Sequence, residues 1–550
     1  MAECLLIRIF AAEQKHTNMK YPIGMQSFDQ IRDEGFVYVD KTALVYDLVT
    51  NGKIYFLSRP RRFGKSLLLS TLENYFLGRK DLFCGLAIDS LEKEWAEYPV
   101  FHIDFNGKNF TSPLELKETI ETFVAMQEDK YGKNPLAVTY GDRISYVFEK
   151  AHEKTGRRVV VLVDEYDKPL LDVMNTGIPS PVVEGEVKTL EDYNRNILKG
   201  FYSVFKLADK HLKFVMLTGV TKFSQVSVFS GFNQPDDISY DGRYDALCGI
   251  TKDELLSVFK ESIKELGEAN GMNEEETVAK LKCKYDGYHF SKDMNDVFNP
   301  FSILKCFKTK TFDNYWFSTG TPTYLVRLLS DNHENVNELA GKYYPPAEFV
   351  DYKATKQRPL PMLYQSGYLT IKGYNARRNT YLLDFPNEEV RSGMTSALAA
   401  DYFGNESRPS TWLDDVSDSL EAGNLEKFKH QLTAFLSNIS YRFQRKDDAM
   451  ECERHFQYTF YLIMLLLGKY NTYIEKETSQ GRIDCILECP DYVYIFEFKL
   501  NSTAEFALKQ IEEKGYASPY AADKRKIYKV GISFSSETGT VNDFDYSPRE

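Results

Sequence analysis

The sequence predicts an α/β protein with a doubly wound parallel sheet, a helical middle region and a second, smaller α/β domain. Three observations lead to this fold class. A short buried strand at 53–57 runs through a Gly-Lys-Ser turn into an apolar helix. A β-branched run at 157–163 ends in two acids, as expected for a strand buried on both faces of a parallel sheet. Far downstream, two short strands at 481–487 and 492–499 carry acids and a lysine.

The segment 59–66, Arg-Pro-Arg-Arg-Phe-Gly-Lys-Ser, predicts a phosphate-binding loop in which Arg59 replaces the usual first glycine. The helix that follows would turn free backbone N–H groups and the positive end of its dipole toward an anion. Lys65 would reach the β- and γ-phosphates of ATP, and the Ser66 hydroxyl would hold Mg²⁺. A basic turn before a surface helix is the alternative interpretation. The residues expected at the nucleotide are Arg61, Arg62, Phe63, Gly64, Lys65 and Ser66.

Asp164 and Glu165 follow the β-branched run at the carboxyl end of its strand, where ligands bind in sheets of this kind. We expect Asp164 to complete the Mg²⁺ shell and Glu165 to polarise the attacking water. Acids that merely cap a strand at a solvated turn are the alternative.

Strands and helices alternate around these motifs. A strand is predicted at 98–105, helices at 113–128, 140–154 and 190–208, and a strand at 212–219. This alternation, at these lengths, is typical of a doubly wound sheet.

Five further motifs accompany the loop. They are Tyr-Pro-Ile-Gly-Met-Gln-Ser-Phe at 21–28, Val-Asp-Glu-Tyr-Asp-Lys-Pro at 163–169, Leu-Thr-Gly-Val-Thr-Lys-Phe-Ser at 217–224, Tyr-Asp-Gly-Tyr at 285–288 and Asn-Tyr-Trp-Phe-Ser-Thr-Gly-Thr-Pro at 314–322. Together they resemble the bacterial AAA-ATPase-like family, over nearly the whole chain from about residue 19. The resemblance accounts for Arg59, because this family has the same version of the loop.

The resemblance implies a P-loop NTPase of the AAA/ASCE type, with an inserted strand in its sheet and with ATP and Mg²⁺ as cofactors. Thr218 lies where such proteins often contact the γ-phosphate, although an ordinary strand-end threonine fits equally well. Residues 251–283, with two amphipathic helices, would begin the lid, and core packing explains their apolar stripe as well. Whether the protein forms a homo-oligomer stays open, and so does the choice of an arginine finger, for which Arg243 is a candidate.

The rest of the middle region is predicted to be mostly helical. Segments 363–371 and 381–386 indicate a β-hairpin of the kind that forms the wing of a winged-helix unit. We therefore divide the chain into a disordered extension (1–18), an ATPase-like domain (19–250), a lid and middle region (251–440) and a C-terminal domain (441–550).

The interpretation of the C-terminal domain depends on Asp484, Glu497 and Lys499, which lie on its two predicted strands. In a strand, Glu497 and Lys499 share one face, and Asp484 on the neighbouring strand can join them. Two carboxylates form an oxygen site suited to Mg²⁺, beside a lysine that can orient water or neutralise phosphate. A half-exposed charged strand without catalysis is the alternative.

This D…E-x-K arrangement resembles the metal site of PD-(D/E)XK nucleases, which AAA-ATPase-like proteins commonly carry at the C-terminus. The resemblance implies that residues 441–550 form a nuclease-like domain. The resemblance adds Glu453 as a further catalytic acid, on a helix before the strands, and the pair Gln510 and Tyr516 as an accessory motif. It implies action on nucleic acid, DNA or RNA, or else a non-catalytic module that binds nucleic acid or protein. A scaffold that binds nucleotide without turnover is a third hypothesis.

Bulk properties agree with this interpretation. The net charge of −12 gives no global basic field, so nucleic acid would have to meet local basic patches. Apolar runs are far shorter than a membrane span, and residues 1–10 have no positive n-region and too brief an apolar core, so we expect no signal peptide there. We expect a cytoplasmic protein that does not contact membranes.

Overall fold

The computed structural model describes residues 19–548, except 175, 183–186, 223–234, 320–324, 326–328, 330–338, 351–358, 403–409, 438–448, 468–469 and 479–480. The extension predicted at 1–18 lies outside the described residues. Contacts divide the chain into two units, Met1–Thr319 with Ala340–Val390, and Gly320–Leu339 with Arg391–Glu550. We describe each unit by itself, and call them the ATPase-like unit and the C-terminal unit.

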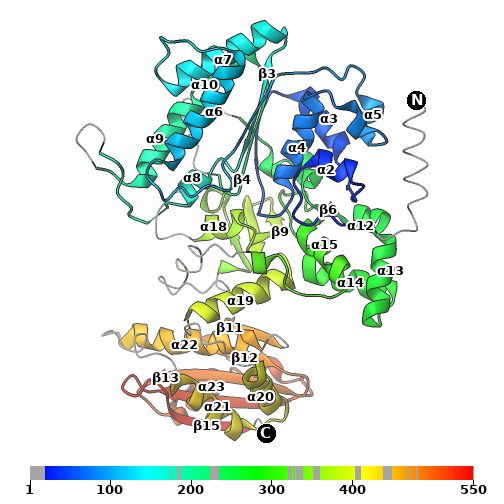
Figure 1. The fold of residues 1–550 in the computed structure, drawn as a ribbon. Helices are drawn as coiled ribbons and strands as arrows, with labels where there is room; N and C mark the ends of the chain where they lie inside the picture. The colour runs from blue at the N-terminus through cyan, green and yellow to red at the C-terminus, as the bar shows by residue number, and fades with distance from the viewer. Residues whose placement is uncertain are drawn as a thin grey trace. The chain divides into compact units, whose positions relative to one another are not determined.

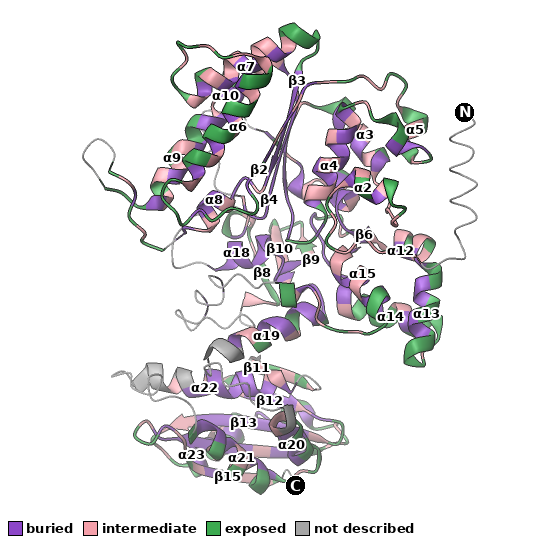
Figure 2. Cartoon of the chain, viewed as in Figure 1, coloured by how far each residue is buried: buried purple, intermediate pink, exposed green. Residues whose placement is uncertain are grey.

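A parallel five-stranded sheet with the order β2-β3-β4-β1-β5 is the centre of the ATPase-like unit. Its strands are β1 (Ile54–Ser58), β2 (Val100–Asp104), β3 (Val159–Asp164), β4 (Leu212–Gly219) and β5 (Asp236–Asp237). β4 lies between the strand of the phosphate loop and the strand of the acids, which confirms the inserted strand. All six residues of β3 are buried, in agreement with its continuous β-branched sequence (Figure 2).

Helices cover both faces of this sheet, with α2–α4 on one side and α6, α7, α9 and α10 on the other (Figure 1). They are α2 (Phe28–Asp33), α3 (Thr42–Asn51), α4 (Lys65–Phe76), α5 (Ala87–Leu91), α6 (Glu115–Tyr131), α7 (Tyr140–Thr155), α8 (Lys168–Leu171), α9 (Leu190–Tyr202) and α10 (Val204–Leu207). The doubly wound α/β fold is thereby confirmed. The helix predicted at 190–208 is two helices, because the chain turns at Ser203.

The middle region contains more and shorter helices than the sequence predicts. They are α12 (Lys252–Val258), α13 (Lys260–Asn270), α14 (Glu274–Tyr285), α15 (Pro300–Thr309), α18 (Leu360–Gln365) and α19 (Glu388–Tyr402). Residues 251–283 thus hold three helices in place of two. Thr251 and Asn273 each begin a helix with a capping box, which fixes two of the boundaries.

The predicted β-hairpin is present but begins later. β9 (Thr370–Asn375) and β10 (Thr380–Asp384) pair antiparallel, and β8 (Lys342–Tyr344) adds a third strand. Residues 363–365 belong to α18 instead of a strand. All six residues of α18 are buried, so its apolar run has neither a helical nor a strand period. A separate two-stranded pair joins β6 (Ile250–Thr251) to β7 (Val297–Phe298).

The C-terminal unit contains a mixed sheet with the order β11-β12-β13-β14-β15. Its elements are β11 (Asn471–Thr478), β12 (Gly481–Glu488), β13 (Tyr492–Leu500), β14 (Lys526–Phe534), β15 (Val541–Pro548), α20 (Ser410–Glu421), α21 (Leu425–Ser437), α22 (Ala449–Leu466) and α23 (Ala504–Glu513). β13 and β14 are parallel, and the other neighbours are antiparallel.

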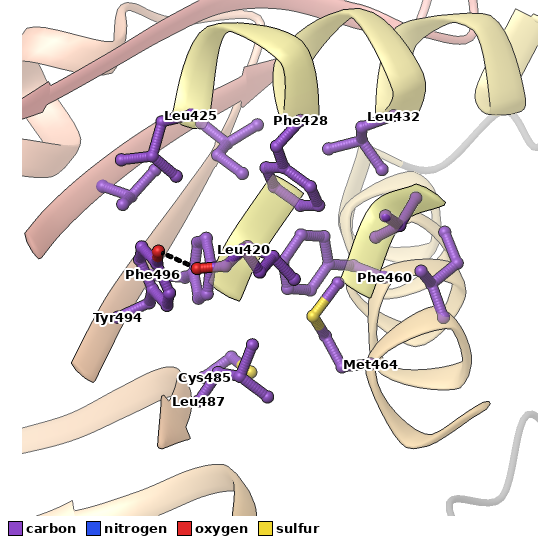
Figure 3. Packing of buried hydrophobic residues seen from close by; sticks show 14 of the residues in the cluster. Leu420, Leu425, Phe428, Leu432, Phe460, Met464, Cys485, Leu487, Tyr494 and Phe496 are labelled. Carbon is purple, nitrogen blue, oxygen red and sulfur yellow. Dashed lines mark hydrogen bonds between the residues drawn. The ribbon is translucent and has the colours of Figure 1, made fainter. Parts of the chain in front are cut away.

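Aromatic and aliphatic side chains together build the larger core of this unit (Figure 3). Phe428 of α21 and Phe460 of α22 meet Phe496 of β13, and the Tyr494 hydroxyl donates to the Leu420 carbonyl at 2.5 Å. Helices α20 and α21 therefore pack on the C-terminal sheet, although the sequence assigns them to the middle region.

The two faces of β13 pack against different helices. Phe496 and Phe498 pack against α22, whereas Val493 and Ile495 join Ile511 of α23 in a second cluster. Alternation along the strand places Glu497 on the α23 face.

Among the described residues, no helix is both long enough and apolar enough to cross a bilayer.

Candidate functional site

The phosphate loop joins β1 to α4 and has its special backbone conformations late in the loop. Arg62 and Gly64 adopt left-handed φ angles of 68° and 92°, whereas Arg59 does not need one. A glycine is therefore not required at position 59. α4 begins directly at Lys65, and no side chain caps its first turn, so its N-terminal N–H groups are available to an anion.

Arg59 points into the core, not toward the phosphates. Its side chain is 1% exposed, and its guanidinium donates to the carbonyls of Ser58, Ser239 and Tyr244. It also lies 4.0 Å from the ring centroid of Phe290. Burial lowers the pKa of Arg59. Of the three loop arginines, only Arg61 and Arg62 are exposed and line the cleft described next.

A cleft of about 340 Å³ opens at the loop, in the size range of small-ligand sites. Its lining includes Arg61, Arg62, Gly64, Lys65, Ser66, Asn106, Glu165, Lys168 and Thr319. Lys65 is buried, and its Nζ donates to the Arg59 and Pro60 carbonyls at 3.0 and 3.1 Å. Burial lowers the pKa of Lys65, against the attraction of nearby Asp164.

Phe63 belongs to the loop but is not among the residues that line the cleft. Its ring is buried against Tyr288 and Phe290, with ring centroids 4.8 and 5.6 Å away. The side chain thus anchors the loop and does not line the cleft.

Asp164 and Thr218 form one hydrogen-bonded pair at the ends of β3 and β4. The Thr218 hydroxyl donates to Asp164 Oδ1 at 2.6 Å, and Glu165 N donates to the same oxygen at 3.0 Å. Both side chains are buried, and neither is among the described residues that line the cleft. Thr218 therefore orients Asp164 in this structure, and its contact with a γ-phosphate stays a prediction.

Glu165 lies at the cleft with a strained backbone. Its φ of 47° is left-handed, which is uncommon for a residue other than glycine and is often found at functional sites. Burial raises the pKa of Glu165, with Lys65 acting in the opposite direction. A carboxyl group with a raised pKa is better suited to accept a proton from water near neutral pH.

Asp167 is a site residue that sequence reasoning did not single out. Its Oδ2 accepts from Val220 N, Thr221 N and the Thr221 hydroxyl, at 3.0, 2.6 and 2.7 Å. It thereby joins the turn after β3 to the turn after β4. The signal was its place in the 163–169 motif, two residues beyond Glu165.

A mostly apolar pocket of about 100 Å³ adjoins the cleft, with which it shares Gly64, Leu67 and Pro300. It is lined by Val37, Val39, Leu247, Ile250 and Phe259, with Tyr38 and Lys41 as polar members. These residues come from distant parts of the sequence, and no local motif marks them.

In the C-terminal unit, strand pairing brings Asp484 beside Glu497. Cys485 pairs with Phe496 and Ile486 with Ile495, so the next pair along the strands is Asp484 and Glu497. Phe498 N donates to Asp484 Oδ2 at 2.8 Å. The predicted juxtaposition of the two acids is therefore present.

Lys499 and Gln510 both reach the same oxygen of Glu497. Lys499 Nζ donates to Glu497 Oε1 at 3.0 Å, and Gln510 Nε2 on α23 donates to it as well. Tyr516 donates instead to the Arg482 carbonyl at 2.9 Å. Gln510 thus belongs to the site, and Tyr516 supports the β12 strand beside it.

The surroundings of Glu497 Oε2 favour the binding of a cation. This oxygen is buried and has no hydrogen-bond partner among the described residues. Burial, and then the charge of Asp484, raise the pKa of Glu497, although Lys499 acts in the opposite direction. Two neighbouring carboxylates with one free oxygen fit a hard divalent cation such as Mg²⁺.

Glu453 is not brought to this pair. It is half-buried near the start of α22, which covers the opposite face of β13. Across the described residues, no three histidine, cysteine, aspartate or glutamate side chains cluster as metal ligands do. Arg243, the candidate finger, is exposed and pairs with Asp241 at 2.6 Å.

Comparison with known proteins agrees with this geometry. Residues 22–229 match the family described as "Predicted AAA-ATPase", and residues 451–544 match a PD-(D/E)XK nuclease superfamily family. The chain is also 35% identical, over 534 residues, to an uncharacterized protein in the vnfD 5′ region of Azotobacter chroococcum mcd 1. That alignment covers 96% of this chain and 98% of the relative.

Proposed function

Because the chain belongs to the AAA-ATPase-like family and carries a C-terminal domain of the PD-(D/E)XK nuclease superfamily, we propose that it hydrolyses ATP and cleaves nucleic acid with Mg²⁺. ATP turnover would reposition the lid and middle helices and so regulate the C-terminal site. We propose a cytoplasmic location and nucleic acid, DNA or RNA, as the partner.

The cleft supports ATP binding. Backbone N–H groups at the start of α4, together with Lys65, would hold the phosphates, and Ser66 and Asp164 would hold Mg²⁺. The adjoining apolar pocket would accept the base, because its aliphatic and aromatic lining suits a flat heterocycle. Arg61 and Arg62 add positive charge at the cleft.

Glu165 carries the proposal that ATP is hydrolysed. It lines the same cleft as Lys65 and Ser66, and burial raises its pKa. In that place it would accept a proton from the attacking water, while Asp164 is kept in orientation by Thr218.

The pair Asp484 and Glu497 supports cleavage at the second site. A bound Mg²⁺ would polarise a phosphodiester and lower the pKa of water. Asp484 and Glu497 would hold the ion, Lys499 would shift from Glu497 to the phosphate or the water, and Gln510 would keep Glu497 in place.

A second candidate is a nuclease fold that only binds nucleic acid or protein. The observation in its favour is that two acids, not three, meet among the described residues and that Lys499 is paired with Glu497. An intact protein that cuts neither DNA nor RNA with any divalent metal would favour this candidate.

The ATPase assignment is tested with Glu165→Gln. We expect ATP to bind with near-normal affinity and hydrolysis to fall by about 100-fold or more, because general-base catalysis contributes roughly 10²–10⁴-fold. The matched control is Glu153→Gln, an exposed residue of α7, which should hydrolyse ATP at the unmodified rate. Equal phosphate release from the two variants would contradict the role of Glu165.

A further inference from the structure

Residues that lie far along the chain contact the phosphate loop. The indole Nε1 of Trp316 donates to the Arg61 carbonyl at 2.9 Å. Gly367 lies so close to Pro60 that a Cβ at Gly367 would be only 2.6 Å from Pro60 Cγ. All of these residues belong to the ATPase-like unit. The loop therefore depends on long-range contacts for its shape.

Trp316 is itself fixed by a buried carboxyl group. Its ring is 5% exposed and packs against Tyr368, with centroids 5.2 Å apart. Its backbone N–H donates to Glu389 Oε1 at 2.6 Å, and the Ser302 hydroxyl donates to Glu389 Oε2 at 2.7 Å. Glu389, in the first turn of α19, thus joins α15 to the turn that carries Trp316.

The contact with Trp316 sets the direction of one N–H group in the loop. The Arg61 carbonyl and the Arg62 N–H belong to the same planar peptide and point in opposite directions. A carbonyl bound to the indole therefore turns the Arg62 N–H away from Trp316. Arg62 has the left-handed φ of 68° and lines the cleft, so this peptide needs an external partner to keep its orientation.

Provided that the cleft binds ATP as proposed above, we infer that Trp316 is a positioning residue for the nucleotide phosphates. Its indole N–H holds the Arg61–Arg62 peptide with the N–H directed to the phosphates, and Glu389 holds Trp316. This gives a role to the 314–322 motif, whose residues up to Thr319 the structure describes. It also explains how a loop in which Gly64 is the single glycine keeps one shape.

The test is the substitution Trp316→Phe, which keeps an aromatic ring against Tyr368 but removes the N–H donor. With a fluorescent ATP analogue and Mg²⁺, we expect the Kd to rise about 3- to 10-fold, the range of one net hydrogen bond. The matched control is Trp95→Phe, because the buried indole nitrogen of Trp95 has no partner among the described residues. Equal Kd values for the two variants would overturn the inference.

Glu389 provides a second variant pair. Glu389→Gln keeps an acceptor for the Trp316 N–H, so the Kd should stay within about twofold of the unmodified protein. Glu389→Ala removes the acceptor and should weaken binding as Trp316→Phe does. An unchanged Kd for Glu389→Ala would contradict the role of Glu389 in holding Trp316 in place.

A spectroscopic measurement covers the case in which Trp316→Phe does not fold. The chain has three tryptophans, so Trp95→Phe with Trp412→Phe leaves Trp316 as the sole emitter. We expect its emission to change when the Mg²⁺ complex of a non-hydrolysable ATP analogue is added, and no change would overturn the inference. Absence of nucleotide binding to the unmodified protein would instead refute the proposed function itself, and Lys65→Ala serves as the non-binding reference.

Discussion

Glu389 is a buried carboxyl group that should make stability depend on pH. Burial raises its pKa from 4.5 to about 7, although Lys284 of α14 acts in the opposite direction. The folded protein then keeps a proton that the unfolded chain has already lost. The free energy of unfolding should therefore fall as pH rises from about 4.5 to about 7.

Glu389→Gln should remove this dependence. Between pH 4.5 and pH 7, the free energy of unfolding of the ATPase-like unit, measured with urea, should fall by about 3 kcal/mol more in the unmodified protein than in the variant. At pH 8 the variant should be the more stable of the two. Parallel pH profiles for the two proteins would contradict the assignment of a raised pKa to Glu389.

At the scale of single residues, the sequence identifies those residues whose role depends on local spacing. Lys65 and Ser66 follow a strand and start a helix, and Asp484 and Glu497 lie on strands that a short turn connects. The inward direction of Arg59 and the role of Trp316 depend on residues about 180 and 255 positions away, so no local pattern can show them. Glu453 fails to meet the acids for a related reason, because the face that α22 covers is a tertiary property.

At the scale of elements, β13 separates two environments by alternation. One face presents Phe496 and Phe498 to α22, and the other presents Glu497 toward α23. Packing on the first face thereby fixes the acid on the second. A register slip by one residue would turn Glu497 into the aromatic core against α22 and move the two rings to the α23 face.

Phe460→Ala tests this packing. The Phe460 ring is 1% exposed and lies 4.9 and 4.8 Å from the rings of Phe496 and Phe498, so its loss should cost the C-terminal unit about 3–5 kcal/mol. The control is Phe506→Ala on α23, whose ring is 57% exposed and should cost far less. Thermal unfolding measures both, and equal shifts would contradict the proposed core.

Sequence periodicity locates most elements of the ATPase-like sheet but fails in two kinds of segment. Strands such as β3 are recognisable because they are long and β-branched. The short helices of the middle region are ended by caps and single turns, such as Phe259 between α12 and α13. In α18 burial on all sides removes the amphipathic signal altogether.

At the scale of the whole molecule, the last division between the two units along the chain falls between Val390 and Arg391, inside α19. The domain boundary predicted near 440 falls among residues that the structure does not describe. Helices α20 and α21 precede it and still belong to the C-terminal core. Composition alone could not show this, because the helices of both units are similarly amphipathic.

Asp484→Ala should separate the two proposed activities. We expect Mg²⁺-dependent cleavage of DNA or RNA to fall by at least about 100-fold, since even residues that only support metal ligands contribute roughly 10–100-fold. ATP hydrolysis should continue at the unmodified rate. Asp491→Ala, an exposed acid in the turn before β13, is the control and should cleave normally. Cleavage by Asp484→Ala at the control rate would remove this carboxylate from the mechanism.

Lys65 has a further consequence through its two bonds to the carbonyls of Arg59 and Pro60. A loop that is already bound to its own lysine has its conformational entropy removed during folding, not when the ligand arrives. An incoming phosphate would exchange one set of partners for another and would not have to order the chain. Nucleotide binding should thus not be slowed by ordering of the loop, and the empty loop should have the same shape as the loaded one.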